Sequence, residues 1–170
     1  LVLTDGHADA QHPPVHALLA VGAIHHHLAE AGLRVRTNLV IDTATVLDPH
    51  QMACLIGFGA TAVHPWMAFD LIHDLHATGR TEGEADPATL MKQWRLGVNK
   101  GLYKILSKMG ISTIRSYRGA SLFEIVGLDA DVSARCFPGA VSRIGGAGFR
   151  DLEADQDALS PAAAGFDRPL

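Results

Sequence analysis

The sequence has little cysteine, no surplus of positive charge and no long apolar run. Its two cysteines, Cys54 and Cys136, show no CxxC spacing. This fits a reducing cytoplasm and leaves a disulfide between them open. The formal net charge of −4 argues against a nucleic-acid partner. No apolar run is long enough to span a membrane, and the first residues lack a signal-peptide pattern. We therefore expect neither a transmembrane helix nor a signal peptide in this sequence.

Strand-like and helix-like segments alternate along the rest of the chain. With 170 residues, 48% of them hydrophobic, one domain with a sizeable core is expected. Strand patterns cover residues 1–5, 35–42, 61–66 and 111–116; helix patterns cover 14–31, 50–60, 67–79, 87–110, 119–128 and 129–137. This alternation predicts an α/β fold of repeated βα units with parallel strands. The pattern leaves a partial (β/α) barrel and an open sheet as alternatives.

The two ends of the chain differ from its middle. It begins inside an expected strand, which suggests a segment of a longer protein. After Pro138 a glycine-rich stretch predicts a loop. We expect residues 1–150 to form the domain, and residues 151–170 to be a Pro/Ala-rich, poorly ordered tail.

Three consecutive histidines, His25, His26 and His27, are the most conspicuous motif among 10 histidines. Successive helix residues point about 100° apart, so the three cannot converge on one ion. Only His26 has a possible ligand four residues away, Glu30, and a histidine pair on a later helix would make half a zinc site. Packing, solvent or a neighbouring domain explains the triplet better than a metal.

A second pattern is the basic stripe of Lys100, Lys104 and Lys108, spaced four residues apart on the longest expected helix. The opposite helix face is apolar. The stripe is either a solvated surface or a surface that holds an anion or a partner domain.

The exact amino-acid sequence around that helix is more informative than the spacing of its lysines. NKGLYKILSKMGIST followed by SYRGASLFE and VGL resembles the central region of the glutamate synthase large subunit. Upstream, PVHALLAVGAIHHHLAEAGLR and VRTNLVIDTATVLDPHQMACLIGFGATAVHPWMAFD are similar to the same family, as is FPGAVSRIGGAGF downstream. The resemblance covers residues 1–149. Asp42, Pro49 and Ser121 replace the family's usual Glu, His and Gln, and similarity ends after Leu152.

The resemblance implies the later part of the central domain of an enzyme that makes L-glutamate from L-glutamine and 2-oxoglutarate. The parent enzyme carries FMN and a 3Fe-4S iron–sulfur cluster and takes electrons from NADPH, NADH or ferredoxin. Residue 1 is Leu rather than the family's catalytic Cys, and neither closely spaced cysteines nor flavin motifs are present. We therefore expect no catalytic, cofactor or metal residues here, and an inactive isolated chain.

By the same resemblance, the segment connects the glutaminase and FMN domains of one cytoplasmic chain and walls part of an ammonia tunnel. A small electron-donating subunit or ferredoxin is a further expected partner. Loops at the carboxyl ends of parallel strands are the expected location of functional residues. The interface candidates are Ser107, Lys108, Met109, Gly110, Ile111, Ser112, Arg118, Ser142, Arg143, Ile144, Gly145 and Gly146.

Three other interpretations remain open at this point. An independent module could bind an anion through Arg118, Arg143 and the SRIGG stretch. A non-catalytic remnant or interaction protein would fit the divergent tail. A zinc hydrolase built on the histidines is the weakest of the three.

Overall fold

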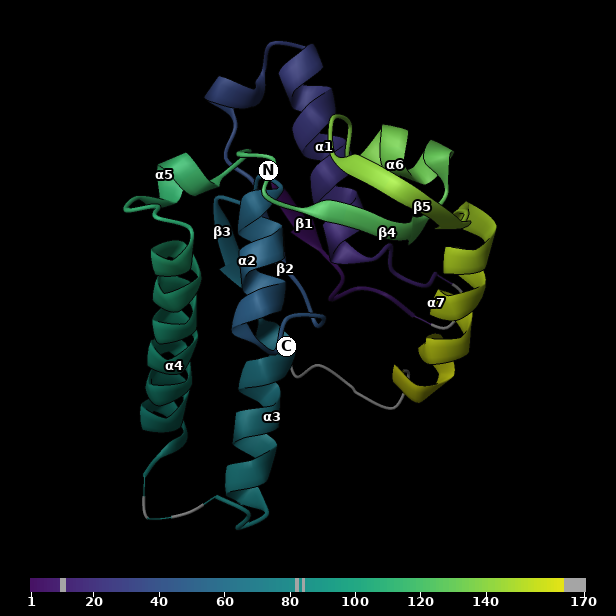
Figure 1. Cartoon of the computed structure of the whole chain (residues 1–170). Helices are drawn as coiled ribbons and strands as arrows, with labels where there is room; N and C mark the ends of the chain where they lie inside the picture. Colours follow the sequence, from purple (N-terminus) through teal and green to yellow (C-terminus); the bar gives the residue numbers. More distant parts are fainter. Residues whose placement is uncertain (10–11, 82, 84, 164–170) are drawn as a thin grey trace.

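The computed structural model describes residues 1–9, 12–81, 83 and 85–163 (Figure 1). In chain order the elements are β1 (Val2–Thr4), α1 (Ala17–Glu30), a 3₁₀ turn (Arg34–Arg36), β2 (Val40–Asp42), α2 (Pro49–Gly57), β3 (Ala62–His64), α3 (Trp66–Ala77), α4 (Pro87–Lys108), α5 (Ile114–Tyr117), β4 (Glu124–Leu128), α6 (Ala130–Cys136), β5 (Val141–Ala147) and α7 (Phe149–Ala163). No described helix combines the length and apolar character that crossing a membrane requires.

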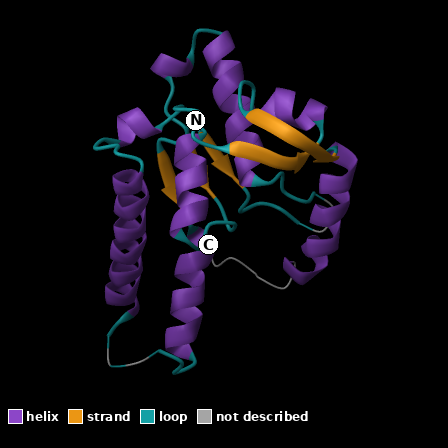
Figure 2. Cartoon of the chain, viewed as in Figure 1, coloured by secondary structure: helices purple, strands orange, loops and turns teal. Residues whose placement is uncertain are grey.

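The main sheet has three parallel strands in the order β1-β2-β3. Figure 2 shows the strands of both sheets in orange. Its register places Leu3, Ile41 and Val63 in one row, and these side chains pack in the core beneath α1 and α2. β4 and β5 form a second parallel sheet. The predicted α/β class with parallel strands is confirmed, and the strands lie in open sheets rather than in a barrel.

The opposite face of the main sheet is uncovered over much of its area. Val2, Val40 and Ala62 share this face, with Val2 60% exposed and Ala62 also exposed. Parallel sheets in globular proteins are almost always covered on both faces. Among the described residues, this face therefore lacks the second layer that such sheets normally have.

Polar residues at the helix starts explain several boundaries. Asp48 accepts a hydrogen bond from the Gln51 backbone, and the Gln51 side chain reaches back to the Asp48 backbone, forming a capping box ahead of Pro49. Asp86 caps α4 by accepting a hydrogen bond from the Thr89 backbone, just before Pro87. Both helices start where the sequence pattern predicts them, within one residue.

Three predictions downstream of α4 are wrong. Residues 111–116, predicted as a strand, contain a loop and the start of α5, because Thr113 caps a helical turn and Tyr117 anchors it in the core. Residues 119–128, predicted as a helix, contain strand β4, since Gly119 and Gly127 adopt left-handed φ angles of 70° and 81° that break a helix. The glycine-rich loop predicted after Pro138 contains strand β5.

The segment after residue 150 also differs from expectation. α7 runs from Phe149 to Ala163, so residues 151–163 are helical rather than poorly ordered. Leu152 packs against the cluster of Ile125, Val132 and Phe137. The last residues of the predicted tail lie outside the described residues, and the domain boundary at residue 150 stays a prediction.

Candidate functional site

A hydrogen-bonded polar row crosses the main sheet at the carboxyl ends of its strands. The register aligns Thr4, Asp42 and His64 on the uncovered face. The Thr4 hydroxyl donates to Asp42 Oδ2 at 2.7 Å, and His64 Nδ1 donates to Asp42 Oδ1 at 2.6 Å. The carboxylate therefore fixes the orientation of both neighbours, and the imidazole is held with Nε2 pointing away from Asp42.

Asp5, one residue beyond β1, joins the loops that follow all three strands. Its carboxylate accepts the Thr43 hydroxyl at 2.6 Å, the Ala44 backbone N–H at 2.9 Å and the Trp66 indole N–H at 2.7 Å. Hydrogen bonds to a charged acceptor are stronger than neutral ones. Asp5 is thus a structural centre that holds the carboxyl edge of the sheet together.

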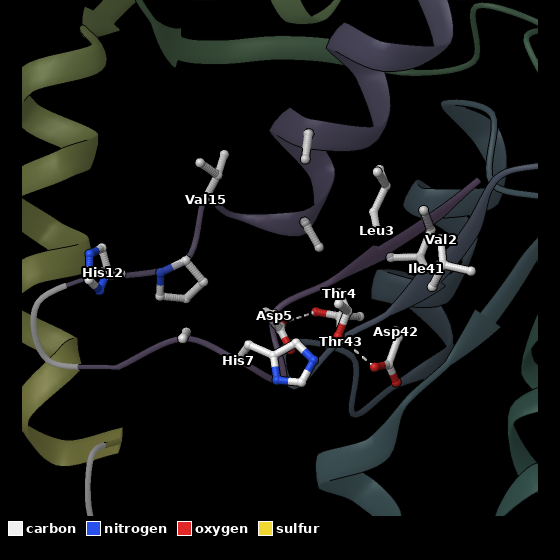
Figure 3. Close-up of a pocket in the computed structure, with 14 residues that line it drawn as sticks. Val2, Leu3, Thr4, Asp5, His7, His12, Val15, Ile41, Asp42 and Thr43 are labelled. Carbon is white, nitrogen blue, oxygen red and sulfur yellow. Dashed lines mark hydrogen bonds between the residues drawn. The ribbon is translucent and has the colours of Figure 1, made fainter.

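A pocket of about 500 Å³ opens beside this edge (Figure 3). Leu3, Ile41 and Val15 line its apolar part, and Asp42 and His7 line its polar part. The pocket combines a carboxylate with an imidazole, which could hold a small polar group. In the described part of the chain, no cluster of three or more His, Cys, Asp or Glu side chains is placed to hold a metal ion.

Sequence reasoning did not select this edge. The usable signal was that Asp5, Asp42 and His64 each stand at or just after the end of a short strand. Because carboxyl ends of parallel strands meet at one edge, these polar side chains had to come together there.

The first group of predicted interface residues forms the corner after α4. Ser107 and Lys108 end the helix, Met109 is 42% exposed, and Gly110 makes the turn with a φ of 69°. The next residue, Ile111, packs against a core cluster, and Ser112 is exposed. The corner therefore offers an exposed surface on a fixed base.

Arg118 lies near the amino ends of β2 and β3, contrary to the expectation of a carboxyl-end loop. The N–H of Gly119 donates to the Gly57 carbonyl at 2.8 Å, which fixes Arg118 beside the end of α2, just before β3. The rule that placed functional loops at the carboxyl ends does not hold for this residue.

The second group, Ser142, Arg143, Ile144, Gly145 and Gly146, lies on strand β5 and is exposed. Gly146 passes so close to the backbone of β4 that a Cβ atom there would overlap its neighbour. The exposed apolar side chains of this sheet include Ile144, at 60%. The β5 group and the α4 corner belong to different elements and stay separate candidates.

The histidine triplet is divided among three environments. His25 Nδ1 accepts the Nε–H of Arg34 at 2.9 Å, and His26 Nδ1 donates to the Gly22 carbonyl at 2.8 Å. His27 is exposed. Burial, then the positive charges of His26, Arg34 and Arg118, lower the pKa of His25 to about 4. His25 is thus neutral near pH 7 and holds an arginine.

The two cysteines do not fit the iron–sulfur cluster that the family resemblance implies for the parent enzyme. Cys54 lies on α2 and Cys136 on α6, and both are free thiols whose pKa is raised mainly by burial. Two protonated thiols on separate helices cannot supply the closely spaced thiolates that an iron–sulfur cluster needs.

Comparison with known proteins identifies the family. Residues 1–129 match the model of the glutamate synthase central domain. The chain belongs to this family. It is 44% identical over 144 residues to ferredoxin-dependent glutamate synthase 2 of Synechocystis. The aligned region covers 79% of the chain and 9% of that protein.

Two further relatives support the same assignment. The chloroplastic ferredoxin-dependent glutamate synthase of Spinacia oleracea is 42% identical over 162 residues, covering 89% of the chain and 10% of that protein. The NADH glutamate synthase of Schizosaccharomyces pombe is 36% identical over 159 residues, covering 94% of the chain and 8% of that protein. This glutamate synthase central-domain chain spans at most about a tenth of the length of these relatives.

Proposed function

We propose that this chain is the later part of the central domain of a glutamate synthase and acts there as a structural connector. In this role it holds the glutaminase and FMN domains in register and forms part of the wall of the ammonia tunnel. The parent protein would make L-glutamate from L-glutamine and 2-oxoglutarate in the cytoplasm. Relatives named for ferredoxin and for NADH both match, so the electron donor is left open.

The observation that carries this proposal is the family match, together with the incomplete sheet. A parallel sheet with an uncovered apolar row, Val2, Val40 and Ala62, needs a covering layer to be stable in water. The relatives are about ten times longer, so other domains of the same chain can supply it. The exposed apolar residues of β4 and β5 extend the surface available for such contacts.

A tunnel explains why a non-catalytic connector would matter for the reaction. Neutral ammonia that leaves the protein is diluted and protonated, whereas a closed path keeps its effective concentration high. The connector therefore needs surfaces that seal against both neighbours. The α4 corner and the exposed strand β5 are our candidates for these surfaces.

Coupling in the full-length enzyme tests the proposal. Coupled turnover yields two glutamates for each glutamine consumed, and leakage of ammonia lowers this ratio toward one. We expect Lys108→Ala and Arg143→Ala to lower the ratio. Lys92→Ala on α4 and Arg150→Ala on α7, both exposed, are matched controls that should leave it unchanged. Equal ratios in all four variants would refute the role of these two surfaces.

The size of the native polypeptide is an earlier and simpler test. An antibody to this segment should detect a band far above 18.1 kDa in host extract. A band near 18.1 kDa would contradict the connector role and favour a free-standing binding module or remnant.

A further inference from the structure

Two arginines meet at the amino edge of the main sheet. Arg34 lies in the turn after α1 and donates to the carbonyls of Thr37 and Gly59, the latter at 2.6 Å, and to His25. All three contacts are internal, so Arg34 ties α1 to the starts of β2 and β3. Arg118 lies within electrostatic reach of both His25 and Arg34.

Arg118 lacks the partners that Arg34 has. Its Nε atom is buried and has no hydrogen-bond acceptor among the described residues. The ion pairs found in the described ranges are His12 with Asp9 and His64 with Asp42, so neither arginine has a carboxylate partner there. Leaving a buried donor unpaired costs about 1–3 kcal/mol, and more for a charged group.

No carboxylate in the described part of the chain forms an ion pair with either arginine. His25 is neutral near pH 7 and cannot balance a cation. The two arginines also repel each other. Burial is the main cause that lowers the pKa of Arg34, and the positive charge of Arg118 lowers it further. Two guanidinium groups within electrostatic reach of each other, with no carboxylate paired to either among the described residues, form a site of positive potential.

A small hollow lies next to the residues that flank Arg118. It has a volume of about 50 Å³, and its lining includes His25, His26, Gly57, Gly119 and Ser121 together with apolar side chains, but neither arginine. Ser121 adopts a left-handed φ of 53°, which is unusual for a residue other than glycine. The loop from Arg118 to Ser121 is thus held in a strained conformation next to the arginine pair.

We propose that Arg118, with Arg34 beside it, binds a carboxylate. A carboxylate can accept from Nε and one Nη of a guanidinium side by side, which satisfies the buried donor and offsets the repulsion between the arginines. The carboxylate comes either from a free small acid or from an acidic side chain of a neighbouring domain. The second source rests on the proposed connector function; the first does not.

The test uses the full native polypeptide and the variants Arg118→Ala, Arg118→Lys and Arg115→Ala. Arg115 is an exposed arginine on the same helix turn and serves as the matched control. The melting temperature is measured with and without acetate, with sodium chloride at equal ionic strength as the reference. Arginine modification by phenylglyoxal, located by mass spectrometry, gives a second measurement at each arginine.

If a free acid binds, acetate raises the melting temperature of the wild type and protects Arg118 but not Arg115 from phenylglyoxal. Arg118→Ala abolishes the rise and Arg118→Lys, which keeps the charge without the fork, reduces it strongly. If a neighbouring side chain binds, acetate has no effect, Arg118 is protected without it, and both Arg118 variants melt lower than Arg115→Ala.

Two results would overturn the proposal. One is that acetate has no effect on the melting temperature of the wild type and that Arg118→Ala melts at the same temperature as Arg115→Ala. The other is full retention of the acetate effect by Arg118→Lys, which would mean that acetate does not need the guanidinium fork of Arg118. The Lys108 and Arg143 coupling ratios do not depend on this site, so failure here leaves the connector role to its own test.

Discussion

The close approach of α1 to α6 at Gly22 leads to a prediction about a single methyl group. Gly22 lies in the middle of α1 and is buried. A Cβ atom there would overlap the carbonyl oxygen of Cys136 and would lie 2.8 and 2.9 Å from two ring carbons of Phe137. The Cys136 oxygen belongs to the backbone, so relief requires that the two helices move apart.

Two opposing free energies decide the effect of Gly22→Ala. Replacing glycine by alanine inside a helix normally stabilises it by about 0.8–1.0 kcal/mol. Overpacking a dense interior costs about 1–3 kcal/mol, and a clash with backbone belongs at the upper end. We therefore expect Gly22→Ala to lower the free energy of unfolding by about 2 kcal/mol.

Gly97 on α4 is the matched control, because no atom lies within 4 Å of a Cβ atom built there. The same substitution at Gly97 should raise the free energy of unfolding by about 0.8–1.0 kcal/mol. Urea unfolding curves with equal m-values measure both changes. If Gly22→Ala proved as stable as Gly97→Ala, the tight packing of α1 on α6 would be wrong.

Three further predictions concern single side chains. Because burial and nearby positive charges lower the pKa of His25 from 6.5 to about 4, the unfolded chain takes up a proton there first as pH falls. Stability is thus fully present above about pH 6.5 and is lost toward pH 4. In unfolding curves across this range, His25→Gln should flatten the loss, while the exposed control His27→Gln should not. Asp5→Ala leaves three donors without their acceptor and should cost about 2–3 kcal/mol in urea unfolding, whereas a neutral effect would refute its central place. Tyr117→Phe removes a buried hydroxyl that has no acceptor among the described residues, so it should raise the melting temperature slightly; a clear drop would reveal a hidden partner.

The first half of the fold was readable from the sequence because local signals and tertiary packing agree there. Asp48 and Asp86 stand before proline at the starts of α2 and α4, and Gly110 ends α4 in a left-handed turn. Strand patterns at residues 35–42 and 61–66 pointed to parallel strands. β2 and β3 lie within these patterns, but the first residues of the 35–42 pattern belong to the 3₁₀ turn rather than to a strand. These elements are specified by residues close to one another in the chain.

The region after α4 was not readable in this way because its structure depends on distant contacts. Residues 119–128 contain helix-compatible residues, but Ile125 packs with Val132 and Phe137, and β4 pairs with a strand about 17 residues later. The β5 stretch contains glycines that suggest a loop, yet the close approach to β4 requires Gly146. Pairing between segments, rather than propensity, decides both strands.

The candidate sites show a similar division. The family wording drew attention to Arg118 and Arg143, but not to Arg34, whose part depends on a turn that brings it to His25 and Gly59. The polar edge with Asp5 could have been expected from strand ends alone. Sequence spacing on one helix argued against one ion held by all three histidines of the triplet, and the structure places them in three separate environments.

The reach of Asp5 along the chain sets a limit on folding during synthesis. Its carboxylate meets Thr43, 38 residues later, and Trp66, 61 residues later. At a synthesis rate of about 5–20 residues per second, the ribosome needs roughly 3–12 s after Asp5 to reach Trp66. Asp5 can join β1 to the loop after β2 once Thr43 and Ala44 have been made, but its bond to the third βα unit waits for Trp66. A nascent chain stalled before Trp66 would carry β1 and β2 joined at this edge, without the bond that ties in the third unit.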